Sequence, residues 1–126
     1  MIFVDTNIII DFWRNPTKEV IEIFRRNEIA TSGIVLAELL HGARSEKEIH
    51  KIMHALSGFS FYEIKHDDWY EIGMMLNKLR KVGLKIPFQD VMLAFIAISN
   101  HLLFWTKDKH FAYIKTHFKS LQLYSL

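Results

Sequence analysis

Short apolar segments of strand length alternate with segments of helical periodicity along the whole of this chain. The expected strands cover residues 2–4, 29–31, 59–64, 102–105 and 121–124. Parallel strands need long crossover connections, which are usually helices, and successive crossovers cover both faces of a sheet. The alternation therefore predicts an α/β fold, a three-layer α/β/α sandwich around a central parallel sheet of four to five strands.

The segments between these strands carry helix start and stop signals. Capping residues or a proline stand at their beginnings, and Gly83 stands near the end of one of them. Behind Ser45, apolar side chains repeat with the i, i+3, i+4, i+7 spacing of a buried helix face. The segment after Pro87 is apolar on nearly every side, so we expect that helix to be buried. The expected helices cover about residues 6–13, 16–26, 32–43, 45–56, 68–83, 89–100 and 108–117.

Length and composition exclude several classes of protein. The chain has 126 residues and no cysteine, so we expect one domain over 1–126 without disulfides or a cysteine-based zinc site. The longest apolar run, residues 91–98, is far shorter than the roughly 18–20 residues that a bilayer requires. The N-terminus lacks the basic segment of a signal peptide. These features predict a cytoplasmic protein, and the net charge of +2 is too small for bulk charge alone to drive binding to nucleic acid.

Four carboxylates interrupt or end apolar segments. Asp5 directly follows the apolar residues 2–4, and Asp108 lies two residues after Thr106 at the end of a later strand. Asp90 lies in the first turn of the most apolar helix, and Glu38 lies inside the apolar helical segment 34–40. Each position is costly for a charge unless something compensates it. Taken singly, such residues are caps, turn residues or edge positions; taken together, they predict a common site at the carboxyl edge of the sheet.

If the carboxylates converge, their repulsion favours a bound divalent cation. Two unit charges about 4 Å apart repel by roughly 4 kcal/mol at an effective dielectric constant near 20. Carboxylates without cysteine favour Mg²⁺ or Mn²⁺ over zinc. Thr6, Asn7 and Thr106 stand beside the acids in the sequence, and we expect them to orient the metal ligands through hydrogen bonds.

The sequence around these residues resembles the PIN-domain ribonucleases. All four acidic positions of that family's pattern are present in order, and the resemblance covers essentially the whole chain. The one slight departure is Phe88-Gln89 before Asp90, where small or acidic residues are common. The motifs that carry the resemblance are Val4-Asp5-Thr6-Asn7, Ala37-Glu38-Leu39, residues 89–97 and Thr106-Lys107-Asp108-Lys109-His110-Phe111.

The length is similar to that of the single-domain toxins of VapC type within this family. The resemblance implies a PIN-like fold and a magnesium-dependent endoribonuclease that is the toxin of a toxin–antitoxin pair. It also implies an RNA substrate, a cognate antitoxin and a homodimer. The implied catalytic and metal-binding residues are Asp5, Glu38, Asp90 and Asp108, with Mg²⁺ as the ion and Mn²⁺ as its alternative.

Basic side chains flank the acidic residues in the sequence. Lys107 and Lys109 bracket Asp108, while Arg80 and Lys85 precede Asp90. Positive charges of this kind would contact the phosphates of RNA, which an acidic centre otherwise repels. The alternative for the residues near position 80 is an ordinary solvated helix face.

Two further pairs of side chains allow more than one interpretation. Phe12 and Trp13 end the first expected helix, where they belong either to the core or to a surface that anchors an antitoxin. His50 and His54 have i, i+4 spacing, but no third metal ligand stands near them in the sequence. We interpret them as surface histidines.

Two alternative functions remain open from the sequence. One is a catalytically silent RNA-binding module of the same fold. The other is a different metal-dependent phosphotransfer enzyme, although an Asp-x-Asp motif is absent because Asn7 stands two residues after Asp5. The sequence contains no glycine-rich phosphate loop, no G-x-S-x-G motif and no H-E-x-x-H motif.

Overall fold

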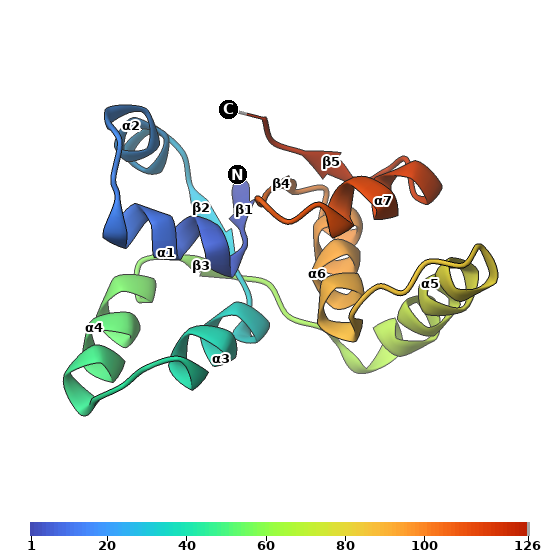
Figure 1. The fold of residues 1–126 in the computed structure, drawn as a ribbon, viewed down its shortest axis with the longest axis horizontal. Coiled ribbons are helices and arrows are strands. Elements are labelled where there is room, and N and C mark those ends of the chain that lie inside the picture. The colour runs from blue at the N-terminus through green and yellow to red at the C-terminus, as the bar shows by residue number, and fades with distance from the viewer. Residues whose placement is uncertain (126) are drawn as a thin grey trace.

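The computed structural model describes residues 1–125, with a five-stranded sheet at its centre (Figure 1). The strands stand in the order β3-β2-β1-β4-β5, and every neighbouring pair is parallel. The predicted parallel sheet is confirmed, although the strands predicted at 59–64 and 121–124 are shorter than expected. The strands are β1 (Ile2–Val4), β2 (Ile29–Thr31), β3 (Ser60–Phe61), β4 (Leu103–Trp105) and β5 (Gln122–Leu123).

Helices cover both faces of the sheet, which confirms the three-layer α/β/α sandwich. Helices α1 to α4 lie to one side of the strands in Figure 1, and α5 to α7 lie to the other. Right-handed crossovers require this division, because the chain moves from β1 to β3 in one direction and then continues through β4 and β5 in the other. Within residues 1–125, no helix is both long and apolar enough to cross a membrane. The helices are α1 (Thr6–Arg14), α2 (Lys18–Arg26), α3 (Gly33–His41), α4 (Glu46–Leu56), α5 (Trp69–Lys81), α6 (Phe88–Ser99) and α7 (His110–His117), with a 3-10 turn η1 (His66–Asp68) before α5.

The order of the strands reverses between β1 and β4. Strand β1 pairs with β2 on one side and with β4 on the other, in a register that places Val4 opposite Trp105. The backbone N–H of Asp5 then donates to the carbonyl of Trp105 at 3.0 Å. In open α/β sheets, ligands bind beyond the carboxyl ends of the strands at such a reversal. The sheet therefore places the residues after β1 and β4 side by side where a ligand is expected.

Aromatic side chains fill the space next to these two strands. Phe3, Phe104 and Phe111 are fully buried. The ring centroids of Phe3 and Phe104 are 5.4 Å apart, and those of Phe104 and Phe111 are 4.6 Å apart in an edge-to-face arrangement. Burying one such side chain stabilises the fold by roughly 1.5–3 kcal/mol. The packing holds β1, β4 and α7 in fixed relative positions.

Helix α1 begins at Thr6 as predicted but has a different capping residue, while α2 and α7 begin two residues later than predicted, at Lys18 and His110. Asp5, rather than Thr6 or Asn7, caps α1, because its Oδ1 accepts the backbone N–H of Thr6 at 2.8 Å. Helix α7 begins at His110 and not at 108, since Asp108 Oδ1 accepts the backbone N–H of His110 at 2.9 Å and closes a turn before the helix. Asp108 therefore lies at the edge of the sheet instead of inside a helix, and Asp5 lies at the same edge, as predicted.

Candidate metal centre

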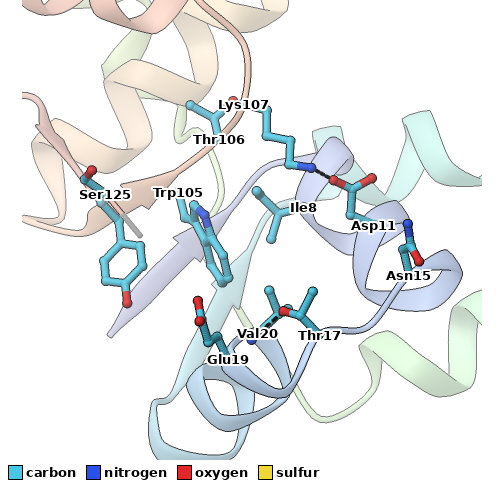
Figure 2. Close-up of a pocket in the computed structure, with 11 residues that line it drawn as sticks. Ile8, Asp11, Asn15, Thr17, Glu19, Val20, Trp105, Thr106, Lys107 and Ser125 are labelled. Carbon is cyan, nitrogen blue, oxygen red and sulfur yellow. Dashed lines mark hydrogen bonds and ion pairs between the residues drawn. The ribbon is translucent and has the colours of Figure 1, made fainter.

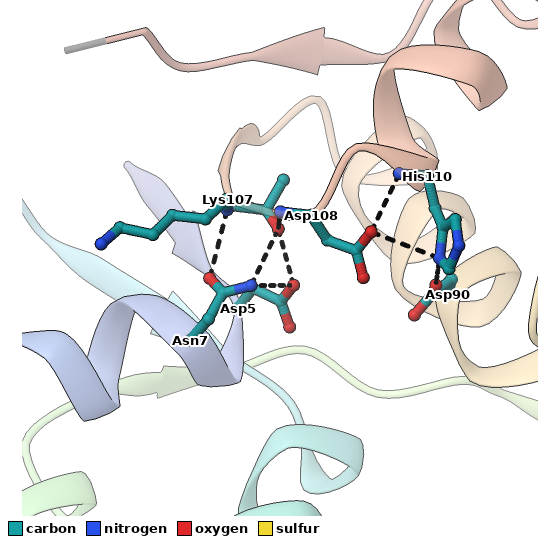
Figure 3. Close-up of polar contacts among 7 residues, drawn as sticks. Asp5, Asn7, Asp90, Lys107, Asp108 and His110 are labelled. Atoms are coloured by element: carbon teal, nitrogen blue, oxygen red, sulfur yellow. Dashed lines mark hydrogen bonds and ion pairs between the residues drawn. The ribbon is translucent and has the colours of Figure 1, made fainter.

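Asp5 lies at the end of β1, at the point where the strand order reverses. Only 6% of the residue is exposed to solvent. Besides the N–H of Thr6, its carboxylate accepts the hydroxyl of Thr106 at 2.7 Å and the side-chain amide of Asn7 at 3.4 Å (Figure 3). These donors compensate much of the cost of burying a charged group.

The side chains of Thr106 and Asn7 connect β1 to the loop that follows β4. The Thr106 hydroxyl donates to Asp5 and accepts the backbone N–H of Asp108 at 3.0 Å. The Asn7 Oδ1 atom accepts the backbone N–H of Lys107 at 3.2 Å. The two side chains therefore fix the position of Asp108 relative to Asp5.

Asp90 and Asp108 share a histidine. Asp90 projects from the first turn of α6, and His110 is the first residue of α7 (Figure 3). The Nδ1 atom of His110 lies 2.8 Å from Asp90 Oδ2 and 3.3 Å from Asp108 Oδ1. Burial raises the pKa of Asp90, while the hydrogen bond with His110 opposes the rise. One potential ligand atom from each of the three residues lies within 4.8 Å of the others.

Glu38 faces the same group of acids from α3. Burial raises its pKa above the ordinary 4.5, and the negative charges of Asp5 and Asp90 raise it further. The hydroxyl of Thr6 lowers the pKa of this carboxyl group. That hydroxyl is buried and has no partner at hydrogen-bonding geometry within the part of the chain that the structure describes.

The charges of the predicted acids act on one another. Burial is the main cause of the raised pKa of Asp5, and the hydrogen bond from Thr106 opposes it. Asp90 and Asp108 each raise the pKa of Asp5 further through their charges. Repulsion of this kind requires short separations. Hydrogen bonds through Thr106 and His110 link Asp5, Asp108 and Asp90. Glu38 lies close enough to Asp5 and Asp90 for their charges to raise its pKa.

This donor set fits a divalent cation. Carboxylate oxygens are the ligands that Mg²⁺ and Mn²⁺ prefer, and the chain has no cysteine to favour a softer metal. The Thr6 hydroxyl, which has no hydrogen-bond partner among residues 1–125, adds a polar atom beside Glu38. A cation at this position would favour the ionised carboxylates and thus oppose the burial and repulsion that raise the pKa values of Asp5, Glu38 and Asp90.

The four basic residues predicted to contact RNA are exposed but differ in their surroundings. Lys107 forms an ion pair with Asp11 of α1, and its side chain runs away from the carboxylates (Figures 2 and 3). Arg80 and Lys85 line one hollow of about 510 Å³ between the end of α5 and the start of α6. Lys109 lies in the turn before α7. The charge of Lys107 is therefore partly neutralised within the protein.

A second hollow, of about 610 Å³, lies between α1, α2 and the end of β4 (Figure 2). Asp11 and Lys107 line it together with Thr106, which links it to the hydrogen bonds around Asp5. Among residues 1–125, none of the four carboxylates lines it. The hollow is therefore adjacent to the candidate metal centre but is not part of it.

His110 belongs to the site but was not predicted as one of its residues. A weak signal was present, since His110 stands two residues after Asp108 and opens the next helix. Its contact with Asp90 depends on how α6 packs against α7, which the sequence spacing does not specify. An isolated histidine near an acid is too common to predict such a contact.

The family of the chain follows from a comparison with family models. The model described as PIN domain matches residues 2–116, a span that includes all four carboxylates. The chain belongs to the PIN-domain family. The resemblance seen in the sequence motifs is therefore confirmed, while no curated protein sequence is significantly similar to this PIN domain.

Solved structures of toxins and toxin–antitoxin complexes share the fold of this PIN domain. VapBC-1 from nontypeable Haemophilus influenzae is 25% identical, with a TM-score of 0.81 over 99% of this chain and 98% of that chain. DNA-bound VapBC from Salmonella typhimurium is 22% identical, with a TM-score of 0.83 over 98% and 96%. Mycobacterium tuberculosis VapC20, described as a sarcin–ricin loop cleaving toxin, is 14% identical, with a TM-score of 0.68 over 90% and 94%. The PIN fold therefore extends over nearly the whole chain.

Family membership also bears on the chemistry of the site. PIN domains are nucleases that generally depend on divalent metal ions, and this one has a cluster of acidic residues and a histidine suited to such an ion. Both observations support a hydrolase that acts on nucleic acid.

Proposed function

We propose that this PIN domain is a magnesium-dependent endoribonuclease, the toxin of a toxin–antitoxin pair, and that it acts in the cytoplasm. The observation that carries the proposal is the group of acidic side chains at the reversal of strand order. Ligand atoms of Asp90, Asp108 and His110 lie within 4.8 Å of one another, Thr106 connects Asp5 to Asp108, and the charges of Asp5 and Asp90 act on Glu38. Family membership and the fold shared with VapBC structures and with VapC20 support the same assignment.

In this proposal the four carboxylates hold Mg²⁺, or Mn²⁺ in its place. A divalent cation supplies activation of a water molecule and neutralises the charge that develops on the phosphate during hydrolysis. The protein keeps the ligands in place: Thr106 and Asn7 orient Asp5, and the Thr6 hydroxyl lies where it can orient Glu38. Prearranged ligands of this kind lower the cost of reorganisation during the reaction.

We infer that the substrate is RNA, bound through basic side chains around the acidic centre. Lys109 adjoins Asp108 and is exposed, and Arg80 and Lys85 share a hollow before α6. Lys107 is the weakest of the four because its ammonium group pairs with Asp11. Phosphate contacts by such residues would position the RNA backbone without selecting a base sequence.

The proposed protein partners are a cognate antitoxin and a second copy of this chain. Trp13 lines a hollow of about 350 Å³ between α1, α3 and α4, and Glu38 lines the same hollow. An antitoxin segment bound there would contact an aromatic side chain and reach a proposed metal ligand. Phe12 has a different place, because its ring stacks on Phe24 of α2 with centroids 4.2 Å apart.

Substitution of Asp90 by Asn tests the proposed activity. The amide keeps the size of the side chain but removes the negative charge, so we expect cleavage of a structured RNA in the presence of Mg²⁺ to fall by a factor of about 100 or more. Gel analysis of the RNA measures cleavage, and circular dichroism checks that the variant is folded. Asp67→Asn, at an exposed position in η1, is the matched control and should cleave like the wild type.

Unchanged cleavage by a folded Asp90→Asn protein would contradict the assignment. Wild-type protein that binds the RNA but does not cut it, with Mg²⁺ or Mn²⁺ present, would favour the catalytically silent RNA-binding module instead.

A further inference from the structure

His110 lies in direct contact with two of the proposed metal ligands. Its Nδ1 atom is 2.8 Å from Asp90 Oδ2 and 3.3 Å from Asp108 Oδ1 (Figure 3). The imidazole side chain is 39% exposed, and the Asp90 side chain is 14% exposed. The ring nitrogen therefore points into the acidic cluster, while part of the ring remains in contact with solvent.

The local backbone fixes this arrangement. Asp108 Oδ1 accepts the backbone N–H of His110 at 2.9 Å, so the carboxylate and the imidazole project from the same turn. The backbone N–H of Asp108 donates to Thr106 at 3.0 Å, which ties the turn to the end of β4. The direction of the imidazole thus follows from the same hydrogen bonds that position Asp108.

The two separations between the imidazole nitrogen and the carboxylate oxygens match those between neighbouring ligands around one cation, and all three atoms lie within 4.8 Å of one another. In octahedral coordination with metal–ligand distances of about 2.0–2.2 Å, neighbouring ligand atoms stand about 3 Å apart. The two separations from Nδ1, 2.8 and 3.3 Å, lie on either side of this value. A cation that binds Asp90 and Asp108 through these oxygens would therefore meet the imidazole nitrogen without a large movement of any of the three residues.

We propose that His110 is a direct ligand of the catalytic cation and that its nitrogen shifts the preference of the site from Mg²⁺ towards Mn²⁺. The inference rests on the proposed function only in that a divalent cation binds the four carboxylates. Mg²⁺ strongly prefers oxygen ligands, whereas divalent transition metals accept an imidazole nitrogen more readily, and Mn²⁺ is the weakest binder among those metals. A nitrogen ligand therefore adds affinity for Mn²⁺ and little for Mg²⁺.

Pulsed electron paramagnetic resonance of bound Mn²⁺ tests the contact itself. Wild-type protein labelled with ¹⁵N-histidine should show coupling between Mn²⁺ and a histidine nitrogen, and His110→Ala should lose that coupling. His54→Ala removes an exposed histidine of α4 and should retain it. The wild-type measurement needs no substitution, so it remains informative even if a variant fails to fold.

Titration calorimetry without RNA tests the selectivity. We expect His110→Ala to weaken Mn²⁺ binding about tenfold or more and Mg²⁺ binding less than about threefold. Mn²⁺ binding without histidine coupling, or coupling that persists in His110→Ala, would overturn the inference. Equal loss of affinity for both ions would also overturn it, because His110 would then only position the carboxylates.

These results separate the inference from the proposed function. Wild-type protein that shows the histidine coupling but cuts no RNA with either ion would refute the ribonuclease activity and leave the ligand role intact. RNA cleavage by a protein whose bound Mn²⁺ shows no histidine coupling would refute the ligand role alone.

Discussion

The hydroxyl of Thr106 connects residues that follow two different strands, and it also accepts the side-chain amide of Asn7 at 3.5 Å. It donates to Asp5 after β1 and accepts the N–H of Asp108 after β4. We predict that Thr106→Val lowers RNA cleavage about 10–100-fold, as expected for a residue that orients metal ligands. The loss of these hydrogen bonds should also reduce the free energy of unfolding by about 1–2 kcal/mol.

Cleavage assays and thermal unfolding together test the role of Thr106. The matched control is Thr116→Val, since the hydroxyl of Thr116 donates to a carbonyl at an exposed position of α7. It should keep full cleavage activity. Equal effects of the two substitutions on cleavage would show that the Thr106 hydroxyl does not orient the site.

The raised pKa of Glu38 predicts a pH-dependent effect on stability. A carboxyl group whose folded-state pKa is raised resists ionisation in the folded protein, so its stabilising contribution is present at low pH and is lost as pH rises above the ordinary 4.5. Without metal, Glu38→Gln should therefore match the wild type near pH 4 and unfold at a temperature a few degrees higher near pH 7.

Thermal unfolding in the presence of a chelator, measured across this pH range, gives the difference between the two proteins. Glu28→Gln, at an exposed position before β2, should show no such trend. If the advantage of Glu38→Gln is constant with pH, the cause is not the ionisation of Glu38.

The neighbours of Asp5 could be predicted from the sequence, but the neighbours of Asp90 could not. Thr106 and Asn7 stand next to site residues along the chain, and the structure places both against Asp5. His110 reaches Asp90 across 20 residues because α6 packs against α7, and only the folded protein creates that contact. The spacing of residues along the chain therefore predicts contacts at the ends of neighbouring strands. It does not predict contacts that depend on how two helices pack.

At the scale of single elements, the end of α5 depends on one glycine. Gly83 has a φ of +82°. Its backbone N–H donates to the carbonyl of Arg80, and the N–H of Leu84 donates to the carbonyl of Leu79, and these two hydrogen bonds end the helix. We predict that Gly83→Ala lowers the free energy of unfolding by about 1 kcal/mol, because a Cβ is disfavoured at positive φ.

Gly73 provides a control of opposite sign. It lies inside α5, and a Cβ added there would meet no atom within 4 Å. Gly73→Ala should raise the free energy of unfolding by about 0.5–1 kcal/mol, since alanine favours the helix. Chemical denaturation measures both changes, and a Gly83→Ala protein as stable as the wild type would contradict the requirement for glycine.

Most elements could be predicted from hydrophobic pattern and capping residues, whereas several boundaries could not. The strand at 29–31 matches β2, and the buried helix after Pro87 is α6. Strand β3 covers only Ser60–Phe61 of the predicted 59–64 because its pairing with β2 involves only two residues on each strand. The ends of a strand depend on which residues of the neighbouring strand it pairs with. The alternation of apolar residues in the sequence does not identify those partners.

At the scale of the whole molecule, the strand order creates the site. The sequence predicted parallel strands and acids at their ends, but the order β3-β2-β1-β4-β5 is a property of the folded sheet. Because β1 and β4 are neighbours, Asp5 and Asp108 lie together although 103 positions separate them (108 − 5). Their shared position follows from topology and not from the spacing of any motif.

The hollow between α1, α3 and α4 links the proposed partner surface to the proposed metal centre. Trp13 and Glu38 both line it, so a bound antitoxin segment would cover an aromatic side chain close to one of the four carboxylates. Aromatic side chains in such positions often dominate binding, and truncation commonly costs 2 kcal/mol or more. We predict that Trp13→Ala weakens antitoxin binding by a factor of about 30 or more and leaves RNA cleavage by the free protein within a few-fold of the wild type.

Binding of the purified antitoxin, measured by calorimetry, tests this prediction. Met53→Ala is the matched control, because Met53 is 48% exposed on α4 and does not line the hollow. The free variant must also unfold at nearly the wild-type temperature, since Trp13 packs against the core. Unchanged antitoxin affinity in a folded Trp13→Ala protein would place the antitoxin on another surface. Loss of affinity in both variants would indicate a binding surface that extends over α4 beyond this hollow.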